Sequence, residues 1–280
     1  MMVVAVIMTV FNRNLKTLSC LEAFEKQSLP SGYELEVFVV DDGSTDGTTD
    51  AIKKKFPKTH VICGDGSLYW NRGMNLAWHE ASNRKPDMYL WLNDDTILVD
   101  NCISCLIQTS MLKMHSSIIV GTTSCDEKHM DILTYGGRIL NSFREVIRPS
   151  KEEPLPCDIF NGNIVLIPKK VFEKVGYNDP YYRHSFGDFD YGVMAQQKGV
   201  LSFVAPGVLG YCCRNNPVPL FQRKCYSIKQ RFRYLYSPLG MNPFEDFHYQ
   251  IKFRNVIYCV AHFIKLHINV FLAKDHKVYE

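Results

Sequence analysis

The chain has 280 residues, of which 46% are hydrophobic and 22% are charged, and its formal net charge is +3. This composition is ordinary for a folded globular protein and excludes a disordered or fibrous chain. The small net charge gives no support to nucleic-acid binding.

Ten cysteines are scattered along a chain that is long enough to fold without disulfide bonds. We therefore expect reduced thiols and a cytoplasmic protein. Residues 1–10 are apolar but lack a basic start and a cleavage site, which favours a first strand over a signal peptide. The sequence contains no run of 18 or more apolar residues, so no transmembrane helix is expected.

The first half of the chain alternates between predicted strands and helices. Residues 3–10 form a continuous apolar run, which is typical of a strand buried on both faces. Further strands are expected at residues 35–40, 59–63, 88–92 and 117–121, separated by helices at 15–27, 46–56, 71–83 and 101–114. This order predicts an α/β fold with a doubly wound, mostly parallel, Rossmann-like sheet.

The second half is less regular. The pattern predicts a hairpin over residues 132–148, a polar link over 151–156, a strand over 164–167, a helix with proline at its first position over 168–175, a helix over 188–198, and strands over 201–205 and 208–212. Beyond residue 219 the chain becomes aromatic and basic, and residues 244–272 predict one long helix. We therefore divide the chain into a domain of residues 1–218 and a helical C-terminal extension of residues 219–280, which packs on that domain or lies on a membrane surface.

Polar clusters follow three of the predicted strands, at residues 9–13, 41–47 and 93–96. In open parallel sheets, ligands bind beyond the carboxyl ends of the strands. The adjacent carboxylates of Asp41-Asp42 and Asp94-Asp95 repel one another, and a divalent cation with a polyphosphate would compensate that charge. The alternative is that these residues only cap and turn the chain.

Several motifs, in order, resemble the inverting family-2 glycosyltransferases of GT-A fold. They are Thr9-Val10-Phe11-Asn12-Arg13, the Val-Val-Asp-Asp-Gly-Ser-Thr-Asp-Gly-Thr of residues 39–48, and the Trp-Leu-Asn-Asp-Asp-Thr of residues 91–96. Residues 64–70, continuing to Asn75, are similar to a bacterial branch that builds surface polysaccharides and includes rhamnosyltransferase-like enzymes. Residues 160–163 and 186–192 extend the match, which covers roughly residues 3–215.

The resemblance implies a reaction and a role for each matching residue. A sugar would move from a UDP-, dTDP- or GDP-sugar to a glycan or lipid-linked acceptor in cell-surface polysaccharide biosynthesis. Asp188 would be the catalytic base, Asp95 would bind Mn²⁺ or Mg²⁺, and the acceptor side would hold Trp70, Asn161 and Asp190. The nucleotide-sugar would bind at Thr9, Phe11, Asn12, Asp41, Asp42, Ser44, Gly66, Ser67, Asn75 and Asp94.

One departure from the family pattern concerns the metal. Many relatives carry a His after the late strand, and residues 208–216 contain none. A thiolate matches magnesium poorly, so we expect Asp95, the diphosphate and water to hold the metal, with Cys212 and Cys213 structural.

Two alternative functions stay open from the sequence. One is a non-catalytic nucleotide- or glycan-binding module of GT-A-like fold. The other is a sugar nucleotidyltransferase, which would need a glycine-rich loop after the first strand that residues 9–13 lack. The oligomeric state is not predicted, and peripheral contact with the inner face of the membrane is the alternative to a purely cytoplasmic location.

Three weaker signals have plain structural interpretations. Trp91 lies inside a predicted strand and is expected in the core, whereas Trp70 is expected in a loop. Cys102 and Cys105 are expected on a packed helix face without metal or redox use. His184 is expected to be a solvated loop residue.

Overall fold

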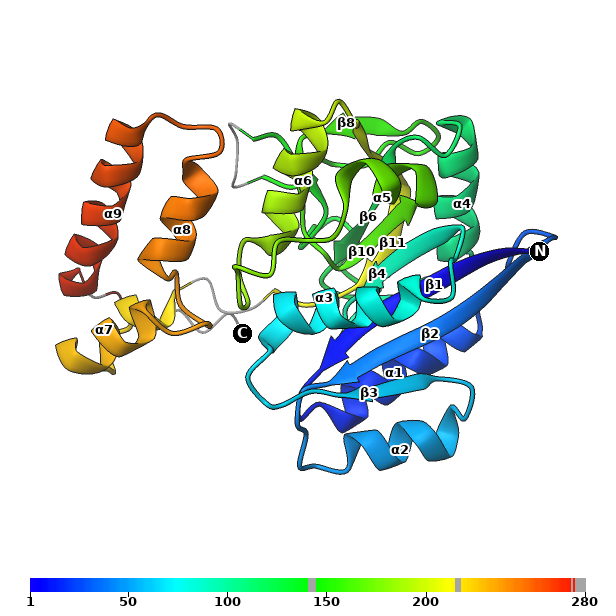
Figure 1. Ribbon diagram of the computed structural model, residues 1–280, viewed down its shortest axis with the longest axis horizontal. Coiled ribbons are helices and arrows are strands. Elements are labelled where there is room, and N and C mark those ends of the chain that lie inside the picture. The colour runs from blue at the N-terminus through cyan, green and yellow to red at the C-terminus, as the bar shows by residue number, and fades with distance from the viewer. Residues whose placement is uncertain (141–144, 215–217, 273, 275–280) are drawn as a thin grey trace.

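The computed structural model describes residues 1–140, 145–214, 218–272 and 274. A central sheet with helices on both faces forms the larger part of the molecule (Figure 1). Three C-terminal helices stand beside it, on the side toward which the first two strands run from the N-terminus (Figure 1).

The elements alternate along the chain much as the sequence predicts. The strands are β1 (Met2–Val10), β2 (Tyr33–Asp41), β3 (His60–Cys63), β4 (Met88–Leu92), β5 (Ile97–Leu98), β6 (Ile118–Ser124), β7 (Gly137–Arg138), β8 (Leu155–Cys157), β9 (Ile159–Phe160), β10 (Ile164–Pro168) and β11 (Ser202–Tyr211). The helices are α1 (Asn14–Glu25), α2 (Thr48–Lys55), α3 (Tyr69–Ser82), α4 (Cys102–Leu112), α5 (Lys169–Val175), α6 (Gly187–Gln197), the short 3₁₀ helix η1 (Leu220–Gln222), α7 (Ile228–Leu235), α8 (Pro243–Gln250) and α9 (Val256–Phe271).

The main sheet runs β3-β2-β1-β4-β10-β6-β11-β5, with β8 also paired to β11. Strands β3, β2, β1 and β4 are parallel to one another, and β6 is parallel to β11. Strand β10 is antiparallel to both of its neighbours. The predicted mostly parallel, doubly wound α/β sheet is confirmed, and the antiparallel insertion of β10 is what the local sequence did not reveal.

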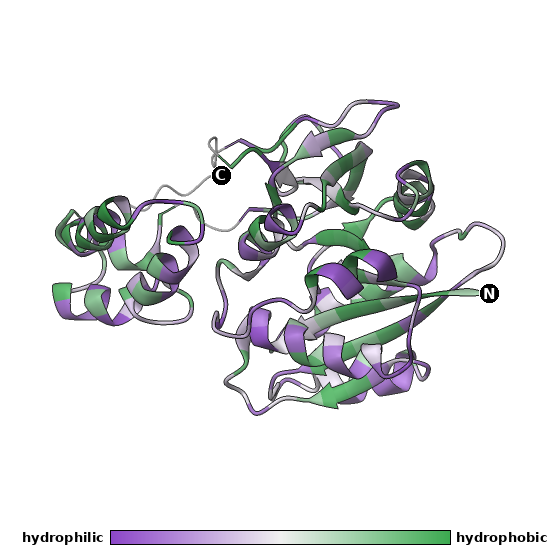
Figure 2. Cartoon of the chain, turned by 45° about the horizontal axis from the view of Figure 1, so that its top comes forward, coloured by the Kyte–Doolittle hydropathy of each residue, from purple (hydrophilic) through white to green (hydrophobic). Residues whose placement is uncertain are grey.

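The sheet is buried on both faces, as the continuous apolar runs predict. Alternate side chains of β1 enter opposite core clusters: Val6 packs on the side of α1 and α4, and Ile7 on the side of α3 and α6. Trp78 of α3 and Trp91 of β4 are fully buried and meet edge to face with ring centroids 5.4 Å apart. The core position predicted for Trp91 is confirmed, and Figure 2 shows the hydrophobic strands between helices of mixed character.

Several boundaries in the second half differ from the prediction. Strand β7 lies inside the predicted hairpin of residues 132–148 but pairs with β9. Gly137 lies opposite Phe160, and Arg138 lies opposite Ile159. Residues 141–144 of that hairpin lie outside the described residues. The two predicted late strands are one strand, β11, in which register shifts beyond Val204 accommodate the extra residues. Pro168 is the N-cap of α5 and not its first residue.

The single long helix predicted over residues 244–272 is two helices, α8 and α9. Asn242 caps α8 by accepting the N–H groups of Phe244 and Glu245, and Asn255 caps α9 by accepting the N–H of Tyr258 at 2.8 Å. Aromatic and apolar spacing continues across the break, which is why the pattern alone suggests one helix.

The C-terminal helices have a small core of their own and are joined to the main domain by ion pairs and by the buried ring of Tyr249, which packs with Ile159, Tyr182 and Val193. Phe221, Leu235, Leu266 and Val270 form the buried core of η1, α7 and α9. Helix α8 meets the main domain through Arg183–Glu245 at 2.7 Å and through other charged contacts described below. Along the part of the chain that the structure describes, every helix is too short or too polar to cross a bilayer.

Candidate functional site

The carboxyl ends of β1, β2 and β4 meet at one edge of the sheet. The register pairs Val10 with Asp41 and Ile7 with Trp91, so the segments that follow these strands lie next to one another. Two of the predicted nucleotide-binding segments are joined directly: the N–H of Asn12 donates to Ser44 Oγ at 2.8 Å, and the N–H of Thr45 donates to Asn12 Oδ1 at 2.7 Å. Thr9 lies at the same end of β1, and its side chain is in close contact with α3 at Gly73. The neighbouring Phe11 is 52% exposed.

Asp41 and Asp42 are buried and organise the loops around them. Asp41 Oδ1 accepts the N–H of Ser44 at 2.8 Å, and its other oxygen accepts the hydroxyl of Thr49. Asp42 accepts three backbone N–H groups, from Gly66 at 2.9 Å, from residue 68 at 3.2 Å and from residue 69 at 2.8 Å. Its charge is therefore satisfied by backbone dipoles, and it holds in place the loop that contains the predicted residues Gly66 and Ser67.

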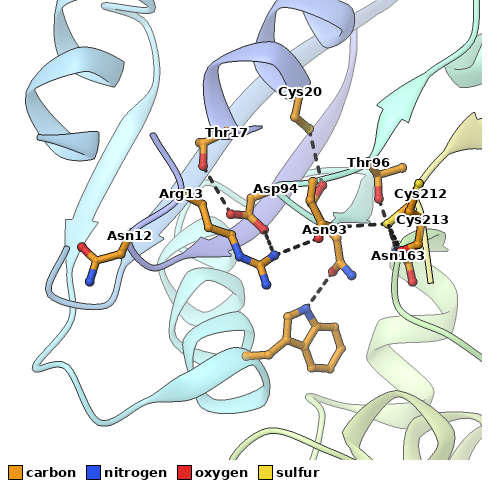
Figure 3. Close-up of polar contacts among 12 residues, drawn as sticks. Asn12, Arg13, Thr17, Cys20, Asn93, Asp94, Thr96, Asn163, Cys212 and Cys213 are labelled. Carbon is orange, nitrogen blue, oxygen red and sulfur yellow. Dashed lines mark hydrogen bonds and ion pairs between the residues drawn. The ribbon is translucent and has the colours of Figure 1, made fainter. Parts of the chain in front are cut away.

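Arg13 reaches the carboxylates that follow β4 (Figure 3). Its Nη1 lies 3.2 Å from Asp94 Oδ1 and 2.8 Å from Asp95 Oδ2. The hydroxyl of Thr17 in α1 donates to the other oxygen of Asp94 at 3.3 Å. Burial raises the pKa of Asp94 to about 6, although Arg13 favours its charged form. The Asp95 side chain is 20% exposed, so it is the member of the pair that reaches solvent.

The residues around Asp95 fit a cation that is held jointly by the protein and by substrate phosphates better than one held by protein ligands alone. Among residues 1–140, 145–214, 218–272 and 274, no group of three or more His, Cys, Asp or Glu side chains is arranged to hold a metal. Cys212 Sγ lies 3.5 Å from Asp95 Oδ1, and burial raises the pKa of this thiol to about 12, so it stays protonated at neutral pH. Mg²⁺ is typically held by one or two carboxylates together with substrate phosphates, and a single accessible carboxylate meets that requirement.

Asp188 is held at the N-terminus of α6. Its Oδ2 accepts the N–H of Gly162 at 2.9 Å, and its Oδ1 accepts the N–H of Phe189 at 2.9 Å. Burial raises the pKa of Asp188 to about 6, opposed by these two bonds and by the positive charge of Arg138. A carboxylate with this pKa is largely ionised at neutral pH and is a better proton acceptor than an exposed aspartate.

Trp70 connects the Asp188 side of the site with the Asp94–Asp95 side. Its Nε1 donates to Asn93 Oδ1 at 2.8 Å, immediately before the carboxylate pair. Its ring lies against Gly162, where an added Cβ would fall only 2.5 Å from the indole and 3.4 Å from the Cβ of Asp188. The backbone N–H of Asn93 also donates to the carbonyl of Asn163 at 3.1 Å. Asp95 and Asp188 are therefore brought to one region, on either side of Trp70 and the segment 161–163.

Four predicted site residues make contacts within the protein, and the loop position expected of Trp70 is wrong. Trp70 is in the first turn of α3 and not in a loop. Asn161 accepts from Arg138 Nε at 3.2 Å. Asn75 donates to the carbonyl of Asn178 at 2.9 Å, which fixes the segment before α6 and is not a contact with the carboxylates. Asp190 is fully buried and bound to Lys252, so it supports α6 from behind.

Three residues near the site received no role, or a different one, from the sequence. Arg13 lay inside a recognised motif, but nothing in the motif indicated its ion pairs. His184 is not a freely solvated loop residue: burial, then the positive charge of Arg13, lowers its pKa to about 4, so it is neutral at physiological pH. Arg138 is buried near Asp188, and its burial, which is unusual for an arginine, became visible only in the structure.

The sequence pattern described as "Glycosyl transferase family 2" matches residues 5–176, which is more than half of the chain. The chain belongs to glycosyl transferase family 2. The match includes the clusters after β1, β2 and β4 and ends before Asp188 of this family-2 glycosyltransferase. A comparison with curated proteins returned no match.

Solved structures of similar fold include TarS and a mannosyltransferase. TarS of S. aureus, solved in complex with UDP-GlcNAc, has a TM-score of 0.58 and 14% sequence identity, and the alignment covers 98% of this chain and 84% of that one. The mannosyltransferase PcManGT from Pyrobaculum calidifontis, solved with GDP-Man and Mn²⁺, has a TM-score of 0.55 and 17% identity, covering 96% and 72%. At these identities the likeness establishes the fold of the family-2 glycosyltransferase, which is GT-A.

Proposed function

We propose that this family-2 glycosyltransferase acts with inversion, moving a sugar from a nucleoside-diphosphate sugar to an acceptor hydroxyl during assembly of a cell-surface glycan in the cytoplasm. One observation carries the proposal. The Arg13–Asp94–Asp95 cluster and the Asp188 carboxyl lie on either side of Trp70, at the edge of the sheet where the strands end. This arrangement provides separate places for a charged leaving group and for an attacking alcohol.

The donor nucleotide would bind over the linked loops that follow β1 and β2. Asn12 and Ser44 connect these loops, and the exposed ring of the neighbouring Phe11 offers stacking to a base. Asp41 and Asp42 shape this pocket from below, because their oxygens already accept backbone and hydroxyl groups. The UDP-GlcNAc and GDP-Man bound in the two similar structures support a nucleotide-sugar donor and leave its base and sugar open.

The diphosphate would lie beside Asp95 and Arg13. A Mn²⁺ or Mg²⁺ ion held by Asp95 would neutralise the charge that develops on the departing diphosphate. Arg13 pairs with both carboxylates and would turn toward the phosphates when the donor binds. Asp94, which is buried and held by Thr17, keeps this end of β4 in position.

Asp188 would accept the proton of the acceptor hydroxyl as that oxygen attacks the anomeric carbon. The bond from the sugar to the diphosphate breaks as the new glycosidic bond forms, and attack from the opposite face inverts the anomeric centre. The N–H groups of Gly162 and Phe189 hold the carboxylate in one orientation, which fixes where its free lone pairs point.

The proposed reaction is tested by screening the full chain against UDP-, dTDP- and GDP-sugars with Mn²⁺. We expect one nucleotide class to raise the melting temperature, because a ligand that binds only the folded state stabilises it. That donor should then show metal-stimulated hydrolysis or transfer. Binding without any turnover across the screen and a set of acceptors would favour a non-catalytic binding module, and release of pyrophosphate from a nucleoside triphosphate and a sugar phosphate would favour a nucleotidyltransferase.

Replacement of Asp95 by Ala is expected to weaken metal-dependent donor binding by roughly tenfold or more, about 1.4 kcal/mol. Without metal, the variant should bind the donor at least as well as the wild type, because Arg13 is released from Asp95. Titration calorimetry with and without Mn²⁺ measures both affinities. The matched control is Glu22→Ala, which removes a half-exposed carboxylate that pairs with Lys55 near the C-terminal ends of α1 and α2. Equal metal-dependent affinity in wild type and Asp95→Ala would remove Asp95 from the metal site.

The value of kcat/KM is expected to fall as the pH drops through about 6. Asp188 must be ionised to accept a proton, and burial raises its pKa to about 6, so a growing fraction is protonated below that pH. Initial rates between about pH 8 and about pH 5 give the profile, with a melting curve at each pH to exclude unfolding. A profile that stays flat to about pH 5 would contradict the raised pKa of the base.

A further inference from the structure

Helix α9 presents its apolar side chains to solvent. Eight of its exposed residues are apolar or aromatic, and within the described helix only Lys265 is both exposed and charged. Six of the eight recur every three or four residues and form one stripe, called here the outer face of α9: Ile257, Val260, Ala261, Ile264, Ile268 and Phe271. Ile257 is 78% exposed and Ile264 is 53% exposed.

Two histidines of α9 point inward and fix this orientation. His262 Nδ1 lies 2.7 Å from Asp246 Oδ2 of α8, and His267 Nε2 lies 2.7 Å from the hydroxyl of Tyr236. Leu266 and Val270 are buried with the core of η1 and α7. Rotating α9 to hide its outer face would break these contacts, so the apolar stripe stays on the surface.

The charges around α9 are of one sign. In residues 218–272 and at 274, every exposed charged side chain is basic: Lys224, Lys229, Arg233, Lys265 and Lys274. The carboxylates of Glu245 and Asp246 are buried and bound by Arg183 and His262. By sequence, residues 219–280 contain ten Lys and Arg against four Asp and Glu, whereas the whole chain has a net charge of only +3. Positive charge is therefore concentrated in the extension.

We propose that the outer face of α9 inserts into the interfacial layer of an anionic lipid membrane, with the helix parallel to the surface. An apolar stripe bordered by lysine and arginine is the pattern of a helix that lies in the interface, where anionic headgroups attract the basic side chains. The 16 residues of α9 extend about 24 Å, enough to lie along a surface. Figure 2 shows hydrophobic residues on these outermost helices, away from the sheet.

A second copy of the chain fits this face less well. A two-fold interface places the same patch on both partners, so the basic residues of two extensions would approach one another. Like charges brought together across an interface oppose association, and the extension exposes no carboxylate among its described residues to balance them. An anionic surface satisfies the apolar stripe and the charges together. The inference does not depend on the proposed transfer reaction, because lipid binding is measured without donor or acceptor.

The test is co-sedimentation of the full chain with vesicles of phosphatidylcholine alone and of phosphatidylcholine mixed with phosphatidylglycerol. We expect binding to the mixed vesicles that weakens as salt is raised. The double variant Ile257→Glu with Ile264→Glu should lower partitioning more than about tenfold, because two apolar contacts are replaced by negative charges. Lys229→Glu with Lys265→Glu should weaken binding to the anionic vesicles through charge alone.

The matched control is Leu112→Glu, in which a leucine that is 72% exposed on α4 becomes charged on the far side of the molecule from α9 (Figure 1). It should bind vesicles as the wild type does. The double Ile variant, the double Lys variant and the control should all keep the wild-type melting temperature, since the substituted side chains are exposed. Unchanged sedimentation of the double Ile variant, or no binding to either vesicle, would overturn the proposal. A wild-type dimer by light scattering that this variant converts to a monomer, without vesicle binding, would assign the face to a second copy.

Discussion

Asp188→Asn is expected to lower kcat by roughly 10²- to 10⁴-fold, the range that a positioned general base contributes. The asparagine has nearly the same shape but cannot accept the proton of an attacking hydroxyl at neutral pH. Donor affinity should stay close to that of the wild type, because Asp188 lies on the far side of Trp70 from the proposed diphosphate position. Single-turnover rates with saturating donor, together with calorimetric donor binding, separate the two effects.

The control for this variant lies two residues further along α6. Asp190 is fully buried behind the site, where Tyr182 Oη donates to it at 2.8 Å. Asp190→Asn should change stability and leave kcat close to the wild-type value. A melting curve of Asp188→Asn confirms that the loss of its second backbone bond has not unfolded α6. Wild-type turnover by Asp188→Asn would remove the base assignment, and equal loss of kcat in both variants would indicate a structural effect.

Lys252→Met is expected to lower the free energy of unfolding by about 3–5 kcal/mol, because it leaves a buried carboxylate without its cation. Lys252 follows α8, and its Nζ lies 2.7 Å from Asp190 Oδ1 and 3.3 Å from Asp179 Oδ2. Asp190 has no exposed surface, and burial already raises its pKa despite the lysine. Denaturant unfolding of the full chain measures the loss.

The pH dependence distinguishes this electrostatic cost from lost packing. The cost arises from ionised Asp190, so protonation at low pH should narrow the difference between Lys252→Met and the wild type. Adding Asp190→Asn to Lys252→Met should recover part of the lost stability, since no buried charge then remains at that position. Lys198→Met is the matched control: this lysine is exposed and its Nζ donates to the carbonyl of Val175, so we expect a change within about 0.5 kcal/mol. A difference that is independent of pH would contradict the proposed role of the ion pair.

This second prediction also concerns the division of the chain. The sequence placed a boundary near residue 218 from the change to aromatic and basic composition. The contacts of Lys252, Arg183 and His248 join α8 and the turn after it to α6 and to the segment before α6, which leads directly to Asp188. We propose that these contacts stabilise the packing of the extension on the main domain, while α9 faces outward.

Much of the fold could be predicted from local patterns. The continuous apolar run of residues 3–10 identified β1, because a parallel strand covered on both faces is rich in apolar residues. Helical spacing identified α1 to α4 to within a few residues. The grouping of Asp41, Asp42, Asp94 and Asp95 also followed, since the carboxyl ends of parallel strands share one edge of the sheet.

The rest depended on partners distant in the sequence. Arg13 meets Asp94 and Asp95 across about 80 residues, and Lys252 meets Asp190 across about 60. Strand β10 has the composition of any buried strand, and only its place between β4 and β6 made it antiparallel. In the segment predicted as a hairpin, β7 pairs with β9, a strand further along the chain.

By itself, the sequence determined the α/β class, the central strands and the loops that carry the carboxylates, because apolar periodicity and turn residues act over a few positions. The tertiary structure alone decided which cation each carboxylate meets, and which face of α9 stays exposed. Periodicity specifies that a helix has an apolar face; only the packing of all the other elements determines whether that face is buried.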